Sequence, residues 1–151
     1  MKNALGCMGY ARSAVVDRTT GQRSSVESQE SAITHAVERD GALGAGARLL
    51  GVVSDPGRPT TDPHRPGLRK LLRTVRQGGV DVVVVTRIDR LTRSFQHLKD
   101  LLEEFELRGV RIVSLEEGID TETLQGRVKV HAIRTGSSDL GQVSRRSRRK
   151  A

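Results

Sequence analysis

The stretch that decides the fold is Asp81-Val82-Val83-Val84-Val85-Thr86. Four consecutive valines favour an extended chain, because a branched β-carbon restricts the side chain and packs well on a pleated surface. Successive side chains of a strand point to opposite faces, so both faces of this strand are apolar and both must be covered. Strands of this kind are typical of parallel sheets that carry helices on both sides. The valine run therefore predicts a central strand of an α/β protein.

Elements of alternating type surround this strand. Apolar side chains at helical spacing, such as Leu68, Leu71 and Val75, predict helices between shorter apolar runs that predict strands. We expect strands at 7–12, 48–54, 81–86 and 110–115, and helices at 24–39, 68–76 and 95–109. This alternation predicts a three-layer α/β sandwich with a mainly parallel sheet of four to five strands and right-handed crossovers.

Composition restricts the classes of function. The chain has 151 residues and only three aromatic ones, so the base-stacking platforms of single-strand binders are excluded. Cys7 is the only cysteine, which excludes an internal disulfide and a thiolate metal cluster. The longest aliphatic run is Val82–Val85, too short for a membrane span, and no signal peptide is visible. We expect a cytoplasmic protein.

The basic charge is concentrated at the C-terminal end. From Arg127 onward the chain has eight basic residues and one acidic residue, which is +7 of the net +8. We expect a domain at 1–128 and a basic tail at 129–151 that is disordered or divergent. The tail arginines would attract phosphate without reading a base sequence, although a solvated tail without function is an equal alternative. These arginines are Arg145, Arg146, Arg148 and Arg149.

Arginines follow several of the predicted strands. Ligands of open parallel sheets bind outside the carboxyl ends of the strands, where the loops meet. Guanidinium groups pair with phosphate oxygens through two parallel hydrogen bonds, so several arginines at this edge indicate a polyanion site. As an alternative, each arginine is solvated and Asp89 caps a helix or pairs with a neighbour. The arginines concerned are Arg12, Arg65, Arg90 and Arg93.

Short motifs add a family resemblance over about residues 7–128. They are Tyr10-Ala11-Arg12, Ser25-Val26-Glu27-Ser28-Gln29, Asp55-x-Gly57, Arg65-Pro66-Gly67-Leu68, Asp89-Arg90-Leu91-Thr92-Arg93, Leu115-Glu116-Glu117 and Ile119-Asp120-Thr121 before Gly126. In this order and spacing they resemble the catalytic domain of the resolvase/invertase family, the serine recombinases. The block that begins at Asp89 after a valine strand is the most specific of them.

The resemblance implies cutting and rejoining of double-stranded DNA. A serine hydroxyl attacks a backbone phosphorus, forms a 5′-phosphoserine and frees a 3′-hydroxyl, with arginines in place of metal ions and without a cofactor. It implies that members act as homo-oligomers. Carried over by position, Arg12, Arg65, Arg90 and Arg93 are the phosphate cluster, Asp89 orients arginines or assists proton transfer, and Gln29 and Asp55 are DNA contacts.

The sequence departs from the family pattern at two places. The nucleophile position, two residues after Arg12, is Ala14, and Ser13 precedes it. Adjacent residues of a strand face opposite sides, so Ser13 reaches the site only if the strand bends there. We therefore expect no strand exchange. The end of the chain also differs from the family, and we expect a truncated member.

Two rival functions stay open at this point. One is a non-enzymatic fragment that binds DNA or an intact recombinase. The other is a flavodoxin-like domain that binds a small phosphorylated ligand, although no glycine-rich phosphate loop follows the first strand.

Overall fold

The computed structural model describes residues 5–13, 25–39, 41–44, 46–58, 62 and 64–136. Strands and helices alternate through this part of the chain, as the sequence predicts. Along the chain the elements are β1 (Leu5–Arg12), α1 (Ser25–Glu38), β2 (Ala47–Asp55), α2 (Pro66–Gln77), β3 (Val82–Val85), the 3-10 turn η1 (Ile88–Arg90), α3 (Phe95–Leu107), β4 (Arg111–Ser114), β5 (Ile119–Asp120) and α4 (Leu124–Gly136).

The described strands form one sheet in the order β2-β1-β3-β4-β5. β1 pairs in parallel with β2 and β3, and β3 pairs in parallel with β4. The two-residue β5 adds an antiparallel edge to β4. The mainly parallel sheet is confirmed, and its carboxyl ends bring the loops after β1, β2 and β3 to one edge.

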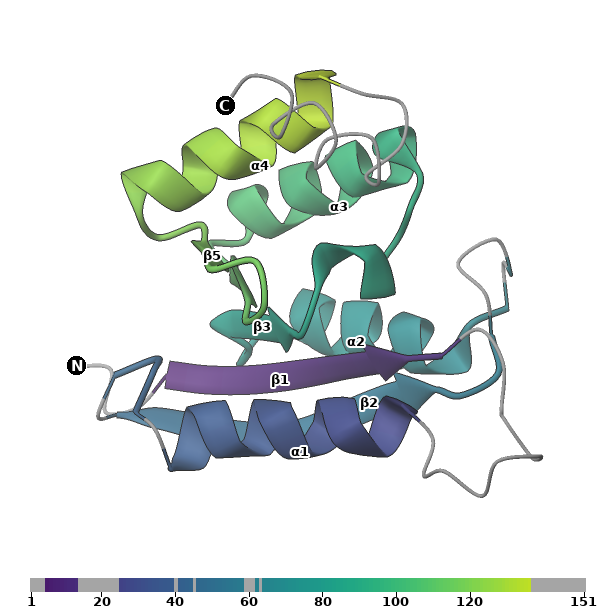
Figure 1. Ribbon diagram of the computed structural model, residues 1–151, viewed down its shortest axis with the longest axis vertical. Helices are drawn as coiled ribbons and strands as arrows, with labels where there is room; N and C mark the ends of the chain where they lie inside the picture. Colours follow the sequence, from purple (N-terminus) through teal and green to yellow (C-terminus); the bar gives the residue numbers. More distant parts are fainter. Residues whose placement is uncertain are drawn as a thin grey trace.

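Helices cover both faces of this sheet. In Figure 1, α1 lies along one face, and α3 and α4 lie side by side beyond the other. Val82 and Val84 pack into the core cluster beneath α1, whereas Val83 and Val85 pack into the larger cluster with α2 and α3. All four valines have no exposed surface. The expectation that both faces of this strand are buried is confirmed.

Glycine at position 9 lets α1 approach the sheet closely. A Cβ on Gly9 would lie 2.8 Å from Cγ2 of Ile33 on α1 and 3.0 Å from Cγ2 of Val52 on β2. Close packing of the helix at this point keeps the N-terminal half of α1 over the end of β1.

The last described helix passes through the expected domain boundary. α4 runs from Leu124 to Gly136, so residue 128 lies inside a helix. Residues 137–151, which include the four tail arginines, lie outside the described part of the chain. The boundary at 128 and the nature of the tail stay predictions.

Candidate functional site

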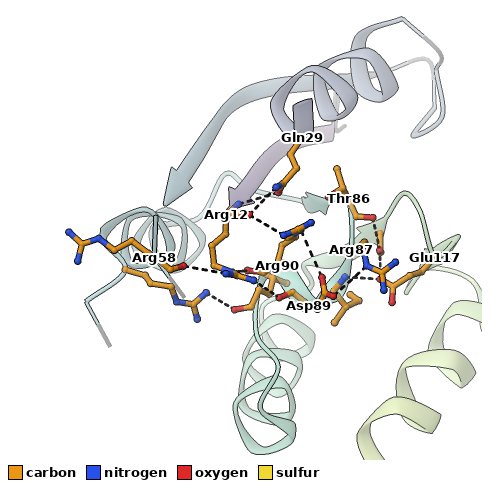
Figure 2. Close-up of polar contacts among 12 residues, drawn as sticks. Arg12, Gln29, Arg58, Thr86, Arg87, Asp89, Arg90 and Glu117 are labelled. Carbon is orange, nitrogen blue, oxygen red and sulfur yellow. Dashed lines mark hydrogen bonds and ion pairs between the residues drawn. The ribbon is translucent and has the colours of Figure 1, made fainter. Parts of the chain in front are cut away.

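The site lies where β1, β2 and β3 end. β1 ends at Arg12, β2 ends at Asp55, and β3 leads through Thr86 and Arg87 into η1. Because these strands are neighbours and parallel, their loops converge at one edge of the sheet. Figure 2 shows Arg12 reaching from the end of β1 to the η1 turn, with the Arg58 carbonyl on its other side.

Arg12 binds main-chain oxygens rather than carboxylates. Its Nε donates to the carbonyl of Arg90 (3.0 Å), Nη2 to that of Asp89 (3.1 Å) and Nη1 to that of Arg58 (3.3 Å). Only 3% of the residue is exposed. Burial lowers the pKa of the Arg12 guanidinium, and the nearby Arg90 and Arg65 charges lower it further. The guanidinium stays charged, since an arginine is not deprotonated in a protein, and it joins two loops to β1.

Gln29 of α1 fixes the backbone of Arg12. Its side-chain oxygen accepts from the Arg12 amide (3.1 Å), and its nitrogen donates to the Arg12 carbonyl (2.9 Å). Arg90 Nη1 also donates to this carbonyl, at 3.4 Å. The Gln29 side chain is buried and acts on the main chain of the site, so its geometry is that of a support for Arg12.

Asp55 anchors the start of α2. Its Oδ1 accepts from the Gly67 amide (2.6 Å), and its Oδ2 accepts from the Leu68 amide (2.9 Å) and the Tyr10 hydroxyl (2.7 Å). Only 1% of Asp55 is exposed. A carboxylate at a helix N-terminus is stabilised by the free amides and the helix dipole. Burial and the bond to Asp55 raise the pKa of Tyr10.

Gly67 allows the end of β2 to approach α2 this closely. A Cβ on Gly67 would lie 2.5 Å from the Ser54 carbonyl oxygen, a distance that real side chains do not tolerate. Just before α2, the buried Arg65 donates through Nη1 to the Leu91 carbonyl (2.7 Å) and the Tyr10 hydroxyl (3.3 Å). Arg65 therefore holds the residue that follows η1, as Arg12 holds η1 itself.

Arg90 and Asp89 form the solvent-facing part of the site. Arg90 has 28% of its side chain exposed and Asp89 has 21%. Asp89 pairs with Arg87 at 3.4 Å and lies 4.0 Å from Nε of Arg90. That Nε and Asp89 Oδ1 have no hydrogen-bond partner in the described structure. Asp89 lies within η1, whose N-cap is Arg87, and the N-cap of the following helix α3 is Ser94, so Asp89 caps neither of them.

Arg93 lies three residues beyond Arg90 and is exposed. No hydrogen bond or ion pair joins its guanidinium to another part of the described chain. The predicted arginines thus fall into an inner pair, the buried Arg12 and Arg65, and an outer pair, the solvent-facing Arg90 and Arg93. The inner pair donates hydrogen bonds to main-chain carbonyls of residues 89–91, the segment that carries Arg90 and leads to Arg93.

Ser13 continues the hydrogen bonding of β1. Its amide donates to the Asp55 carbonyl (3.4 Å), its carbonyl accepts from the Arg58 amide (2.8 Å), and its Oγ accepts from the Gly57 amide (3.2 Å). Only 4% of Ser13 is exposed. The hydroxyl is engaged with the loop after β2. Ala14 lies outside the described residues.

Sequence reasoning missed Glu117. One of its carboxylate oxygens, Oε1, accepts from the Ile88 amide (2.7 Å) and from the Ser114 hydroxyl (2.6 Å), as Figure 2 shows in part. Glu117 thereby satisfies the first amide of η1 from a different segment of the chain. In the sequence, Glu117 is marked by its place in the family motif at 115–117. The motif does not indicate what the side chain does.

No group of three His, Cys, Asp or Glu side chains in the described part of the chain is placed to hold a metal ion. None of the helices there has the length and apolar character needed to cross a membrane.

Comparison with known proteins gives the family. A family model described as the resolvase N-terminal domain matches residues 7–150. The DNA-invertase of Enterobacteria phage P7 is 40% identical over 98 residues, which are 65% of this chain and 50% of the relative. "Probable DNA-invertase y4cG" of Sinorhizobium fredii is 33% identical over 126 residues, 83% of this chain and 35% of the relative.

The fold is similar to that of a solved recombinase domain. The N-terminal catalytic domain of TP901-1 integrase superposes with a TM-score of 0.72 at 22% identity, over 96% of this chain and 98% of that one. The chain belongs to the resolvase family of serine recombinases and carries its catalytic-domain fold. It spans half or less of the length of these two curated relatives.

Proposed function

We propose that this chain is the catalytic domain of a site-specific DNA recombinase and that its outer arginines, Arg90 and Arg93, bind a phosphodiester of double-stranded DNA. The observation that carries the proposal is the position of Arg12. Two of its three hydrogen bonds to main-chain oxygens fix the turn that bears Arg90, and the third goes to the Arg58 carbonyl. A phosphate bound there meets the Arg90 guanidinium, which its bond to the Arg12 carbonyl already holds in place, so little reorganisation of that group is needed.

The inner arginines add charge to this edge without reaching solvent. In the described part of the chain, neither Arg12 nor Arg65 has an ion pair with a carboxylate. Neither charge is neutralised by direct contact: Arg65 is linked to the Asp55 carboxylate only through the Tyr10 hydroxyl, and Asp89 acts on Arg12 without contact. Charge interactions in such a partly buried site are stronger than in water. This supports binding of an anion whose charge increases in a transition state, as in phosphoryl transfer.

Ser13 supports a second candidate, a domain that binds DNA or an intact recombinase without cutting. A nucleophile needs a hydroxyl that reaches the phosphorus, and Ser13 Oγ is buried and accepts a bond from Gly57. Removing a hydrolase nucleophile costs a factor of roughly 10⁶ in turnover. We expect DNA binding at the arginine edge and no covalent intermediate.

The binding half of the proposal is tested with Arg90→Gln/Arg93→Gln. The slope of log K against log salt is negative. If these side chains hold phosphates, each lost contact lowers the magnitude of this slope by about 0.9, so the double variant lowers it by about 1.8. Fluorescence anisotropy with a labelled duplex over a salt series measures the slope. Arg39→Gln/Lys99→Gln is the matched control, because it removes two exposed positive charges from other elements. Equal slopes in the two double variants would refute phosphate binding by Arg90 and Arg93.

The cleavage half is tested by incubating the full chain with supercoiled plasmid and denaturing the mixture. We expect no protein joined to DNA. An adduct that Ser13→Ala abolishes would overturn this expectation and make Ser13 the nucleophile.

The proposed setting is the cytoplasm, and the proposed partner is double-stranded DNA. Assembly with further copies of the chain is a prediction from the family.

A further inference from the structure

Helix α2 carries basic side chains that the site does not use. Its sequence from Pro66 to Gln77 contains Arg69, Lys70, Arg73 and Arg76 and no acidic residue. All four basic residues are exposed. The opposite side of the helix is apolar and buried in the core. The orientation of α2 is therefore fixed, and its basic face points to solvent.

Three of these residues continue a row that begins inside the site. Arg65, Arg69, Arg73 and Arg76 are spaced by four, four and three residues, so they share one face of a helix. With a rise of 1.5 Å per residue, the row extends about 16 Å from Arg65. Arg65 is the N-cap residue, with an extended backbone, and its carbonyl accepts from the Arg69 amide (3.0 Å). We call Arg69 and Arg73, with the adjacent Lys70, the α2 row.

The charges of the α2 row are available, whereas that of Arg76 is not. No hydrogen bond or ion pair within the described residues engages the side-chain charge of Arg69, Lys70 or Arg73. Arg76, one turn further on, donates to both oxygens of Glu104, at 2.6 and 2.9 Å. The row of uncompensated charge therefore begins beside the site and ends at this ion pair.

We propose that the α2 row binds the phosphate backbone of the DNA that flanks the phosphodiester at Arg90. The inference rests on the proposed function, and it extends the DNA contact from the sheet edge along one helix. Duplex DNA is a partner that fits, because its phosphates form a line of charge and counterions are released when lysine and arginine neutralise them. Helix α2 itself carries no carboxylate, so its own side chains do not repel a polyanion.

The test compares Arg69→Gln/Arg73→Gln with Arg39→Gln/Lys99→Gln in the full chain. Both variants remove two exposed positive charges, so a general effect of net charge is the same in each. We expect the α2 variant to lower the magnitude of the slope of log K against log salt by about 1.8 relative to wild type, since each phosphate contact contributes about 0.9. The control variant changes the slope less. Thermal melts followed by circular dichroism verify that both variants fold.

The outcomes separate the two proposals. If wild type fails to bind the duplex, the proposed function fails and the α2 proposal with it. If Arg90→Gln/Arg93→Gln lowers the slope but the α2 variant matches the control, the α2 row is only a solvated face and this inference alone is refuted. Loss of self-association in sedimentation velocity, with an unchanged DNA slope, would assign the row to a second copy of the chain and also overturn it.

Discussion

Two aspartates that the sequence assigns to the site have opposite environments. Asp55 is buried and its carboxylate accepts three hydrogen bonds, one of them from a hydroxyl and two from the first amides of α2. Asp89 is partly exposed, and its Oδ1 has no partner in the described structure. The first carboxylate therefore stabilises the fold, and the second lies between the side chains of Arg87 and Arg90.

The first prediction concerns Asp55. Asp55→Ala leaves the Gly67 and Leu68 amides and the Tyr10 hydroxyl without an acceptor in a buried place, which lowers the free energy of unfolding by about 3 kcal/mol. Urea denaturation followed by circular dichroism measures this. Asp62→Ala is the control, because Asp62 pairs with Arg58 at the surface, where loss of an ion pair has little effect on stability. Equal effects would show that the α2 cap contributes little.

For single residues, the sequence predicts which side chains lie close together at the site but not which atoms they bond to. The order of strands brings Arg12, Arg65 and Arg90 to one edge, because loops at the carboxyl ends of neighbouring parallel strands are close in space. The partners of Arg12 and Arg65 are largely main-chain oxygens. Every residue has a main-chain carbonyl, so the sequence does not show which carbonyls accept these hydrogen bonds. The division into inner and outer arginines therefore required the three-dimensional structure.

At the scale of elements, the short turn η1 is held from outside. Its N-cap residue, Arg87, provides no side-chain cap. The Ile88 amide donates its hydrogen bond to Glu117, in the turn after β4. Ser114 at the end of β4 donates to the same carboxylate oxygen. The position of Arg90 therefore depends on a segment almost thirty residues further along the chain.

A second prediction follows for Glu117→Ala. Without the acceptor, the Ile88 amide loses its hydrogen bond, so its hydrogen exchange becomes faster and the turn that bears Arg90 loosens. We expect weaker DNA binding, by about fivefold, which corresponds to a lost hydrogen bond worth about 1 kcal/mol. Glu116→Ala is the matched control, since it removes a neighbouring exposed carboxylate and leaves the Ile88 amide bonded. Equal exchange rates at Ile88 in the two variants would contradict the positioning role.

Most long elements were predictable and the short ones were not. The exception among the long elements is α4, a helix of 13 residues that was not among the predicted helices. The helices at 68–76 and 95–109 and the valine strand agree with the structure, because their periodic patterns extend over several turns or cover two sheet faces. β5 has two residues and η1 has three, too few to show a period. Both are positioned by contacts with distant segments, and neither was predicted.

At the scale of the whole molecule, one ion-pair cluster connects two helices that cover the same face of the sheet. Glu104 of α3 accepts two hydrogen bonds from Arg76 of α2 and lies 3.4 Å from Arg108. Mainly through the bond from Arg76, these contacts lower the pKa of Glu104 below its ordinary value of 4.5. A carboxylate whose pKa is lower in the folded chain stabilises the fold above its unfolded pKa.

The third prediction is therefore a pH dependence. The difference in free energy of unfolding between wild type and Arg76→Gln should be constant near neutral pH and shrink as the pH falls below 4.5. Its size should be only about 0.5 kcal/mol, because the pair is partly exposed and screened. Denaturant titrations across the acidic range measure it. Arg73→Gln on the same helix is the control, because Arg73 has no carboxylate partner among the residues that the structure describes. A similar pH dependence there would contradict the assignment.

The way Arg12 is bonded has a consequence for how this scaffold tolerates genetic change. Its three acceptors are peptide oxygens of Arg58, Asp89 and Arg90, which every amino acid supplies. Mutations at those positions can replace the side chains and leave the acceptors in place. The position of η1 beside Arg12 therefore tolerates substitution of the side chains at these three positions, because the hydrogen bonds that fix it do not involve those side chains.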